Sequence, residues 1–563
     1  MASRLADPGP ASASALALAQ KVGLSFTVAA WLDRDRAGDE AGLARWLEPK
    51  LAHLTPPDAL KDLELAADRL AHAVRRGERV AVFGDYDCDG ITSCAIVTEL
   101  LRAFGAEVVP LLASRFRGGY GFSQPALESV VGSGARLLVT CDCGSSDAPR
   151  LRALAEHGID AVVIDHHLVP AEPLPALAFL NPHRPDCGFP YKGFASCGLA
   201  MILGASLRRA LDRPFDVRTL LDLVAVGTVA DVAPLDGDNR ALVRKGLEVL
   251  AAGERVGLSA LALAGTGGRK RALSSEDVAF QIAPRINAPG RLGDPMVSLE
   301  VLLEKDPVRA HELAHEIELI TKKRREIQRV LVAEALAEVD ARGSREHEGI
   351  VLGRQGWHVG IVGIVAGRLA SELARPVIIV ALEGESGRGS ARAPAGFRIH
   401  DALVRCQDTL IGFGGHQAAA GLEVRADRLD ELREAWRAAC ALGSDDQIDA
   451  RAAHQPDVRL DERDDLMHVL ADLERLEPTG HGNPAPRLFL PAVDVLGARA
   501  VKGHLKLELS VRGKRVGGFF PENGDKAEEL LRGRLNLSAR LKRDHYRGGD
   551  AAELLVLGYE KLA

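Results

Sequence analysis

The sequence has no long uninterrupted apolar run. No stretch of about 18 or more continuous apolar residues occurs in its 563 residues, so no membrane-spanning helix is expected. The first twenty residues are rich in Ala, Ser and Pro but lack a basic segment followed by an apolar core, which argues against a signal peptide. We therefore expect a cytoplasmic protein that does not enter a membrane and has a flexible N-terminus.

Cysteine is sparse as well, and several common enzyme signatures are missing. The eight cysteines show no CxxC spacing, so neither a disulfide framework nor a structural zinc site is expected. Cys141 and Cys143 flank Asp142, and we interpret them as small packing residues at a buried strand end. The sequence contains no P-loop, no nucleophile elbow and no dinucleotide fingerprint. No motif therefore indicates P-loop, Ser-His-Asp or dinucleotide-dependent chemistry.

What the chain does contain is typical of a multidomain globular protein. Apolar residues make up 47% and charged residues 26% of the chain, whose length suggests roughly three or four domains. The net charge is −7, but residues 481–563 carry 15 Lys and Arg against 10 Asp and Glu. An acidic body with a mildly basic C-terminal region fits a metal-binding part joined to a part that binds a polyanion.

Three aspartates crowd one turn near the start of the chain. Asp85, Asp87 and Asp89 follow the apolar segment Arg79–Phe83, which we predict to be a buried strand, and a helix is predicted to begin near residue 91. Ligands bind at this end of the strands in open α/β sheets. Aspartate also suits turns for conformational reasons, but carboxylates so close together repel unless protons or a cation neutralise them. The pattern therefore favours a divalent-metal site.

Further acidic and imidazole side chains follow other predicted strands. Asp142 comes after one apolar strand, and Asp165, His166 and His167 come after the next. Asp231 lies in a long apolar neighbourhood. If the strands are parallel, the strand-end groups meet at one edge of the sheet. Carboxylates with one or two imidazoles suit Mn²⁺ or Mg²⁺, and a pair of such ions can neutralise charge at phosphorus. Phosphoester hydrolysis is the predicted reaction class.

The pattern of strands and helices predicts α/β domains. Helices are expected near residues 91–104, 123–133 and 147–157, between strands in a mostly parallel sheet covered on both faces. A second α/β unit is expected from about residue 347 to 440. The predicted strands are Arg79–Phe83, Glu107–Leu112, Arg136–Thr140, Ala161–Ile164 and Leu177–Leu180 in the first unit, and Gly349–Leu352 and Pro376–Val380 in the second.

A long helix is predicted to connect these two units. Asp306 is a plausible N-cap with Pro307 at the first helical position, and apolar residues recur at helical spacing up to about Ala341, before Gly343. Its length is on the order of 50 Å. This is too long for one domain, so we interpret it as a strut between two lobes that leaves a cleft. A basic run at residues 322–325 is either a solvated face or a contact to nucleic acid.

The C-terminal region has a different period. Residues 505–511 and 535–541 alternate apolar and polar side chains and are separated by Gly-rich turns, which predicts a small antiparallel barrel. The predicted organisation is a flexible N-terminus (1–40), a catalytic α/β domain (41–300), a connecting helix (301–345), a second α/β domain (346–445) and a barrel of OB-fold type (446–563).

Taken together, these motifs resemble the DHH phosphoesterase superfamily and, within it, the RecJ family of single-strand-specific DNA exonucleases. The motifs are spread over nearly the whole chain from about Trp46. They are residues 84–90, 142–144, 165–167, 227–231, 282–291, 357–366, 389–392, 412–418 and 480–484.

The resemblance implies a role for each matching residue. Metal ligation is expected from Asp87, Asp89, Asp142, His166 and Asp231, with Asp85 and Asp165 as supporting or alternate ligands. Asp142, His166 and His167 are the expected catalytic residues, with His167 facing the scissile phosphate. The substrate-binding residues implied are Arg115, Arg285, Asn287, Arg291, Ser390, Arg392, Gly415 and His416.

The resemblance also implies an activity and partners. We expect 5′→3′ hydrolysis of single-stranded DNA to 5′-mononucleotides by two Mn²⁺ or Mg²⁺ ions, with the 5′-phosphate anchored by basic groups, in DNA repair and recombination. Single-strand-binding protein and a helicase are the expected partners of a monomeric enzyme. Aromatic residues form only 4% of the chain, which favours backbone capture over extensive base stacking in the barrel.

Two alternatives remain open from the sequence. Smaller members of the superfamily hydrolyse very short RNA, cyclic dinucleotides, nucleotide phosphates or pyrophosphate, and they generally lack a terminal barrel. A non-enzymatic nucleic-acid adaptor is the other alternative, and the intact set of Asp and His residues argues against it.

Overall fold

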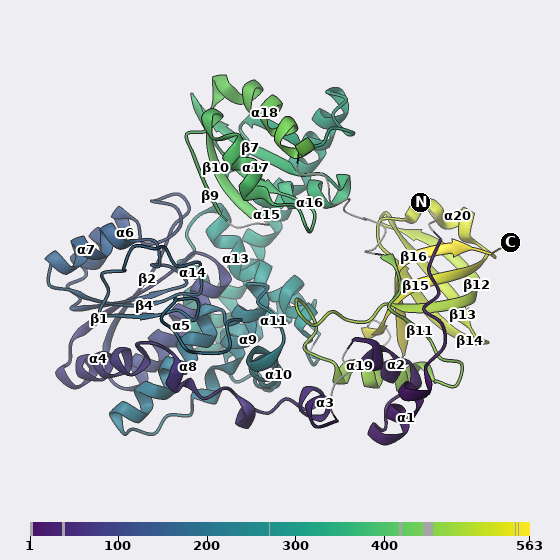
Figure 1. Cartoon of the computed structure of the whole chain (residues 1–563), viewed down its shortest axis with the longest axis horizontal. Coiled ribbons are helices and arrows are strands. Elements are labelled where there is room, and N and C mark those ends of the chain that lie inside the picture. Colours follow the sequence, from purple (N-terminus) through teal and green to yellow (C-terminus); the bar gives the residue numbers. More distant parts are fainter. Residues whose placement is uncertain are drawn as a thin grey trace. The chain divides into compact units, whose positions relative to one another are not determined.

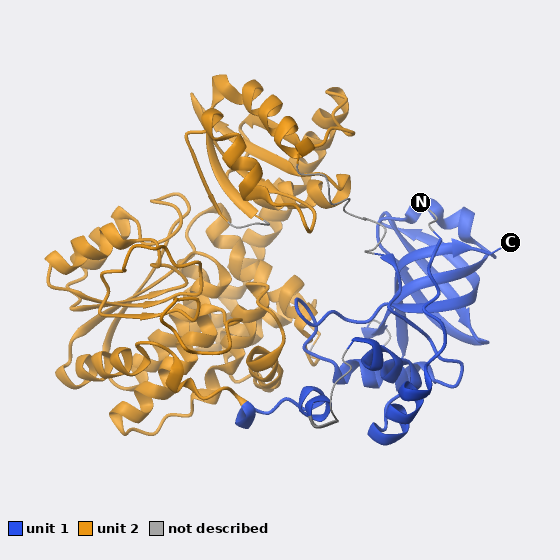
Figure 2. Cartoon of the chain, viewed as in Figure 1, with its two compact units in different colours: residues 1–53, 449–563 blue, residues 54–448 orange. Residues whose placement is uncertain are grey.

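The computed structural model of the protein describes residues 4–35, 40–269, 271–415, 419–442, 454–545, 548–549 and 551–562. The chain divides into two compact units (Figure 2). Residues 54–448 form the larger unit, and residues 1–53 with 449–563 form the smaller. The larger unit holds two α/β domains and the smaller holds a β-barrel, so the predicted fold class is confirmed.

A five-stranded parallel sheet is the centre of the first α/β domain. The strand order is β2-β1-β3-β4-β5, and every neighbouring pair is parallel. All five strands were predicted, with ends within one residue of those observed, because strands buried on both faces appear as short apolar runs. The strands are β1 (Arg79–Gly84), β2 (Glu107–Leu112), β3 (Leu137–Cys141), β4 (Asp160–Ile164) and β5 (Ala178–Leu180).

Helices cover both faces of this sheet (Figure 1). Ala81 and Phe83 point to the face that α6 and α7 cover, where they join a core with Phe122 and Leu151. Helices α4, α5 and α8 lie on the other face. The bounds are α4 (Leu63–Arg76), α5 (Cys88–Ala103), α6 (Gln124–Gly132), α7 (Ala148–Glu156) and α8 (Ser196–Leu211).

A helical subdomain completes the first domain. Helix α9 packs on α5, α8 and α10 and is buried along nearly all of its length. Its C-terminal end points Asp231 toward the residues that follow the strands, as described below. The helices are α9 (Leu221–Ala230), α10 (Gly237–Ala252), α11 (Val256–Gly265), α13 (Ala283–Leu292) and α14 (Met296–Leu303).

The predicted connecting helix is α15 (Pro307–Ala341), with the bounds expected from sequence. The carboxylate of Asp306 caps it by accepting hydrogen bonds from the backbone N–H groups of Val308 (3.2 Å) and Arg309 (3.3 Å). The first half of α15 packs on α11 and α13, and the second half joins the core of the next domain through Leu331 and Val339. One helix therefore belongs to two hydrophobic cores.

The second α/β domain contains a mixed sheet in the order β6-β7-β8-β10-β9. Strands β6 and β7 are parallel and were predicted, whereas β8, β10 and β9 are antiparallel and were not. Their many glycines hide them, since glycine disfavours strands. The elements are β6 (Ile350–Gln355), α16 (Val362–Leu373), β7 (Val377–Glu383), β8 (Ser386–Arg392), α17 (Ile399–Arg405), β9 (Gly412–Gly415), β10 (Ala419–Arg425) and α18 (Leu429–Leu442).

The smaller unit is built on a closed barrel. Its strands pair in the order β12-β13-β14-β16-β15, and β15 pairs back onto β12, while β11 adds to β12 outside the ring. The predicted period-two pattern is confirmed in β13 and β15. The elements are β11 (Val458–Arg459), α19 (Leu466–Arg475), β12 (Leu488–Val501), β13 (His504–Val511), β14 (Lys514–Phe520), α20 (Ala527–Leu530), β15 (Arg534–Arg543) and β16 (Ala552–Lys561).

The N-terminus corrects the sequence expectation of a flexible segment over residues 1–40. Residues in this region form α1 (Ala13–Val22) and α2 (Phe26–Asp35), and Trp31 is buried in the core of the smaller unit. The carboxylate of Asp464 accepts hydrogen bonds from the backbone N–H groups of Phe26 (3.0 Å) and Thr27 (2.7 Å). Sequence patterns missed this packing because the partners are more than 400 residues apart.

No single helix among the described residues is long and apolar enough to cross a membrane. The bent pair α1 and α2 passes such a test together, by length and composition only.

Candidate metal centre

Three carboxylates stand in a row at one edge of the parallel sheet. Asp85, Asp142 and Asp165 each directly follow a strand. Their backbone N–H groups donate to the carbonyl oxygens of Cys141 (3.1 Å), Ile164 (2.9 Å) and Leu180 (3.1 Å), in that order. The sheet ladder thus extends one residue beyond β1, β3 and β4. This extension brings the three side chains to the same edge, as the sequence predicted.

The other two aspartates of the first turn belong to helix α5. Asp87 is its N-cap and accepts hydrogen bonds from the backbone N–H groups of Asp89 and Gly90 (both 3.1 Å). A Cβ on Gly90 would lie 2.6 Å from the backbone N and O of Asp85, so only glycine fits this turn. The carboxylate of Asp89 is buried and accepts hydrogen bonds from the N–H groups of Ser196 (2.7 Å) and Cys197 (3.0 Å).

The N-terminus of α8 therefore holds Asp89 in place. The exposed backbone N–H groups and the helix dipole stabilise a negative charge there. Sequence reasoning missed Ser196 and Cys197 because their contribution comes from backbone N–H groups, which leave no signature in side-chain patterns.

His166 connects the strand-end carboxylates with Asp231. Its Nε2 lies 3.1 Å from Oδ1 of Asp142, 3.8 Å from Oδ2 of Asp231 and 4.0 Å from Oδ2 of Asp89. The backbone N–H of Asp231 donates to the carbonyl of Gly227 (2.9 Å), so its position is set by the end of α9. Residues up to 142 positions apart in sequence are thus joined at one imidazole.

Three overlapping groups of side chains could each hold a metal ion, with ligand atoms within 4.8 Å of one another. Asp142 belongs to two of them and His166 to two, so the groups form adjoining positions. Oδ1 of Asp85 is buried and has no hydrogen-bond partner among the residues that the structure describes. A cation would satisfy it, and the donor set fits Mn²⁺ or Mg²⁺. The groups are Asp85, Asp87 and Asp142; Asp89, His166 and Asp231; and Asp142, His166 and His167.

Burial and close spacing favour the protonated forms of the carboxyl groups in this cluster. Desolvation, followed by the charges of neighbouring aspartates, raises the pKa of both Asp85 and Asp142 well above the usual range. The same causes raise the pKa of Asp231 to about 8. The folded protein therefore retains protons on these carboxyl groups unless a positive ion replaces them.

Asp165 supports His167 and belongs to none of the three groups. Its carboxylate accepts hydrogen bonds from the backbone N–H groups of Ser145 (3.0 Å) and His166 (2.8 Å), and Nδ1 of His167 lies 2.7 Å away. Burial opposes protonation of His167, but the hydrogen bond to Asp165 and its charge outweigh burial and raise the pKa of His167 to about 9. A supporting role for Asp165 therefore fits better than direct ligation.

Two further side chains hold His167, and sequence reasoning did not assign them. Nδ2 of Asn181 donates to the carbonyl of His167 (2.8 Å), and the hydroxyl of Tyr120 lies 3.1 Å from Nδ1 of its ring. Asn181 directly follows β5, so the strand-end rule that found Asp142 and Asp165 could have found it too.

We predict that the metal-free protein loses stability as the pH rises from about 4 to about 8. Asp231 has a folded pKa of about 8 and an unfolded pKa near 3.9, so in this window only the folded state keeps the proton, and raising the pH favours unfolding. The thermal midpoint measured in chelator should fall with pH, and Mn²⁺ should raise it most at pH 8, where fewer protons compete. The Asp231→Asn variant should show a weaker pH dependence. A thermal midpoint that rises with pH, or that does not change when Mn²⁺ is added, would contradict the assignment of Asp231 to the metal centre.

Arginines from both α/β domains lie beside the cluster. The guanidinium of Arg115 lies 4.1 Å over the ring of Tyr86, and Nη1 of Arg392 donates to Oγ of Ser390 (2.8 Å). Nη1 of Arg291 donates to the carbonyl of Gly360 (3.3 Å). Burial, then the charges of Arg115 and Arg324, lowers the pKa of Arg291 to about 10. Among the residues that the structure describes, Arg115, Arg291 and Arg392 form no ion pair with a carboxylate.

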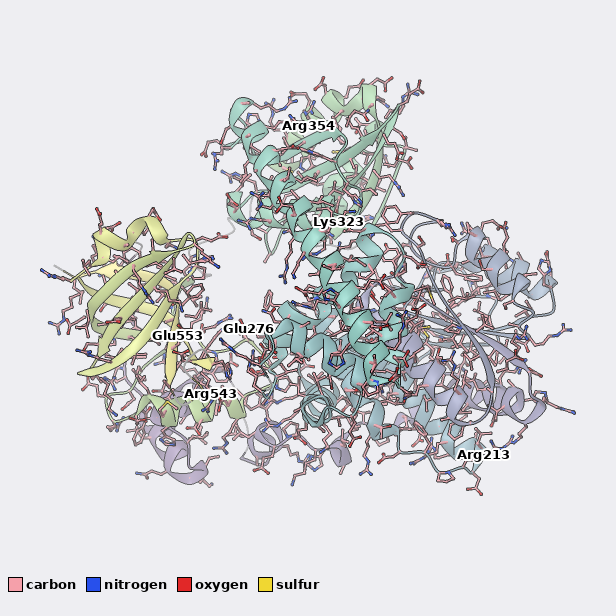
Figure 3. All side chains as sticks on the ribbon, turned by 180° about the vertical axis from the view of Figure 1, so that it is seen from behind. Arg213, Glu276, Lys323, Arg354, Arg543 and Glu553 are labelled. Carbon is pink, nitrogen blue, oxygen red and sulfur yellow. The ribbon has the colours of Figure 1, made fainter. Side chains whose placement is uncertain are left out.

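Helix α15 adds positive charge at the same junction. Arg324 is buried, and its Nε has no partner within the described part of the chain. Burial, followed by the charge of Lys323, lowers the pKa of His358 in the second α/β domain, and Lys323 is labelled on α15 in Figure 3. The basic run at 322–325 is thus not simply a solvated face, because Arg324 is directed inward.

The remaining predicted substrate-binding residues differ in burial and in their contacts. Arg285 is buried and bonded to Glu318 (2.9 Å) and the carbonyl of Gln281 (2.6 Å), so it serves the packing of α13 on α15. Asn287 is half-buried on α13, and Gly415 is exposed at the end of β9 with φ 144°. His416 lies outside the described residues.

Comparison with known protein families gives three matches, one in each of the three predicted domains. Residues 79–228 match the N-terminal domain of the DHH family, residues 346–442 match the DHHA1 domain, and residues 457–557 match the RecJ OB domain. Together these matches span more than half of the chain.

Curated relatives and solved structures agree with these matches. The chain is 32% identical to a single-stranded-DNA-specific exonuclease RecJ of Haemophilus influenzae, over 91% of this chain and 92% of that protein. It is 32% identical to RecJ of Bacillus subtilis, over 92% of this chain but only 66% of that protein. Crystal structures of Thermus thermophilus RecJ with Mn²⁺ and with Mg²⁺ superpose with TM-scores of 0.80 and 0.74, at 31% and 30% identity, covering 100% of this chain and 79% and 78% of those chains.

The identity to the Haemophilus protein extends over almost the full length of both chains, and all three domains match in order. The chain therefore belongs to the RecJ family of DHH nucleases.

Proposed function

We propose that the protein is an exonuclease that removes 5′-mononucleotides from the 5′ end of single-stranded DNA. One observation carries this proposal: the Asp and His residues that could hold divalent cations lie beside Arg115, Arg291 and Arg392. We call these three residues the arginine cluster, and none of them forms an ion pair with a carboxylate among the described residues. The Asp and His residues can act on a phosphodiester, and the arginine cluster can hold a terminal phosphate. The names of the relatives support the substrate, and the Mn²⁺ and Mg²⁺ complexes of the Thermus protein support the cofactor.

The side chains of the metal centre have distinct tasks in this proposal. Asp85, Asp87 and Asp142 would hold one cation, and Asp89, His166 and Asp231 a second. Bound divalent cations supply neutralisation of the phosphate charge and polarisation of the attacking water. His167, protonated and oriented by Asp165, would donate a hydrogen bond to the scissile phosphate. We therefore propose that two cations bind, one at each of these groups.

The arginine cluster would fix the polarity of digestion. Arg115, Arg291 and Arg392 offer guanidinium forks, and Ser390 adds a hydroxyl, so a dianionic 5′-phosphate would be held more tightly than a 5′-hydroxyl. One nucleotide then separates the anchored end from the metal centre. We place the activity in DNA repair and recombination in the cytoplasm, by analogy with the family.

One assay tests the whole proposal. End-labelled single-stranded DNA and RNA, with and without a 5′-phosphate, are incubated with the protein in Mn²⁺ or Mg²⁺. We expect mononucleotides from phosphorylated DNA in Mn²⁺, slower release without the 5′-phosphate, and none in chelator. Release of products from the 3′ end, or turnover restricted to dinucleotides, would overturn it and favour one of the smaller DHH activities.

The barrel presents a row of side chains suited to a strand of nucleic acid. Register pairs Arg499 with Lys506, Lys506 with Phe519, Phe519 with Leu555, and Leu555 with Arg540, so these five lie side by side across β12, β13, β14, β16 and β15. Lys506, Leu555 and Arg540 each lie between two core residues of their strand, which turns these side chains outward. An aromatic ring beside a lysine, with an arginine at each end of the row, suits base stacking and phosphate contact together.

We predict that Phe519→Ala weakens binding of long single-stranded DNA. A stacked base contributes about 1–3 kcal/mol, so the dissociation constant should rise at least about fivefold. Turnover of a dinucleotide should not change, because it is too short to need the barrel. Fluorescence anisotropy with a labelled 30-mer measures the first, and the control is Leu531→Ala, which removes an apolar side chain that is 45% exposed outside the row. Equal effects of the two substitutions would argue against the row.

A further inference from the structure

Val232 has a backbone conformation that does not suit its residue type. It follows Asp231 at the end of α9 with φ 59°, in the left-handed region. The N–H of Val232 donates to the carbonyl of Val229 (3.2 Å) and that of Ala233 to Thr228 (3.2 Å), the pattern in which glycine usually stands. Among the described residues with positive φ, Val232 is the only one that is β-branched, and β-branched side chains are the most strained there.

At other helix ends in the left-handed region the chain uses glycine or a residue that is not β-branched, and Asp212 and Ala374 end α8 and α16 with φ 51°. Gly23, Gly77 and Gly253 end α1, α4 and α10 with φ between 65° and 75°. Packing does not explain the valine either, because its side chain is 64% exposed. The strain at Val232 is not offset by packing of its side chain within the protein, which indicates that the side chain contacts a bound ligand instead.

The position of Val232 indicates what that contact is. Asp231 shares a candidate metal group with Asp89 and His166. The arginine cluster adjoins the other group, since Arg115 lies over Tyr86, between Asp85 and Asp87 in sequence. A strand whose 5′-phosphate is held by the arginines and whose first phosphodiester is at the metal centre would continue past Asp231.

We propose that the side chain of Val232 packs against the base of the second nucleotide, the one that becomes the new 5′ end after each cleavage. The base is the apolar part of a nucleotide, and an aliphatic group covers it without reading its sequence. Val232 thus acts as a positioning residue that keeps the scissile bond at the metal centre. This inference rests on the proposed exonuclease activity.

The test combines a variant enzyme with a modified substrate. First-cleavage rates are measured in single turnover on 5′-phosphorylated single-stranded DNA with either a normal second nucleotide or an abasic one. Val232→Gly should reduce the first-cleavage rate about tenfold on normal DNA. On the abasic substrate, the variant and the wild type should cleave at the same rate. The thermal midpoint of the variant should equal or exceed that of wild type, because glycine relieves the strain.

Two further variants complete the design. Val232→Ile keeps a branched aliphatic side chain and should retain wild-type turnover. Ala374→Gly, which relieves a left-handed residue (φ 51°) at the end of α16, should change neither rate. If Val232→Gly lowers the cleavage rate equally on both substrates, Val232 acts through Asp231. If it leaves the rate on normal DNA unchanged, Val232 does not contact the base. Either result overturns the inference. Failure of the wild-type protein to cleave normal DNA would instead reject the proposed function.

Discussion

Replacing Asp142 by Ala is expected to abolish nucleolysis and leave DNA binding largely intact. Asp142 belongs to two of the three candidate metal groups and lies 3.1 Å from Nε2 of His166, so no other single carboxylate connects as many potential ligands. Its loss should reduce turnover by at least about 10³-fold, in line with the removal of a group that stabilises transition-state charge. Binding should persist because the arginines and the barrel carry the positive charge that attracts phosphates.

The measurement pairs nuclease assays with binding assays on the same variant. Asp160→Ala is the matched control, since Asp160 is an exposed aspartate at the opposite end of β4. It should keep wild-type turnover. In chelator, Asp142→Ala should also be at least as stable as wild type, because a buried carboxyl with a raised pKa is removed. Parallel losses of binding and turnover would contradict the assigned role.

Replacing Arg255 by Met is expected to destabilise the catalytic domain by about 3–5 kcal/mol. Arg255 joins three helices: it donates to Asp222 on α9 (2.8 Å), to Glu99 on α5 (2.6 Å) and to the carbonyl of Leu302 on α14 (3.2 Å). Its side chain is only 7% exposed. Without the guanidinium, the buried carboxylate of Asp222 is left without its countercharge.

Urea unfolding of the variant and wild type measures this difference. Arg309→Met is the control, because Arg309 forms an exposed ion pair with Glu312 and its loss should have little effect. Replacing Arg255, Glu99 and Asp222 together by apolar residues of similar size should recover much of the lost stability, since no buried charge then remains. A change as small as that of the control would show that the ion pairs do not hold these helices together.

Several residues of the metal centre could be predicted from their positions after apolar strands. Apolar runs in the sequence locate β1, β3 and β4. Because parallel strands present their carboxyl ends at one edge of a sheet, the sequence alone predicts that Asp85, Asp142 and Asp165 lie close together. The caps and apolar spacing of α15 were equally visible, because both are local in sequence. Such features depend on interactions within a few residues, and a pattern can record them.

Other parts of the site depend on segments that meet only in the folded chain. Asp89 is held by backbone N–H groups 107 and 108 residues away, and no side-chain pattern marks a backbone donor. Arg285 matches a substrate motif, yet its guanidinium is directed to Glu318. The apolar residues of α1 and α2 look like a loose Ala-rich tail until the barrel core covers them.

The sequence by itself determined which side chains can bind a cation or a phosphate and on which strand ends or loops they stand, because residue chemistry and hydrophobic period are local properties. Only the tertiary structure decided that Asp165 turns to His167, that Arg285 is diverted into helix packing, and that Val232 is both strained and exposed. The physical reason is that hydrogen-bond direction, burial and backbone strain arise from contacts between distant segments, and these exist only once the chain has folded.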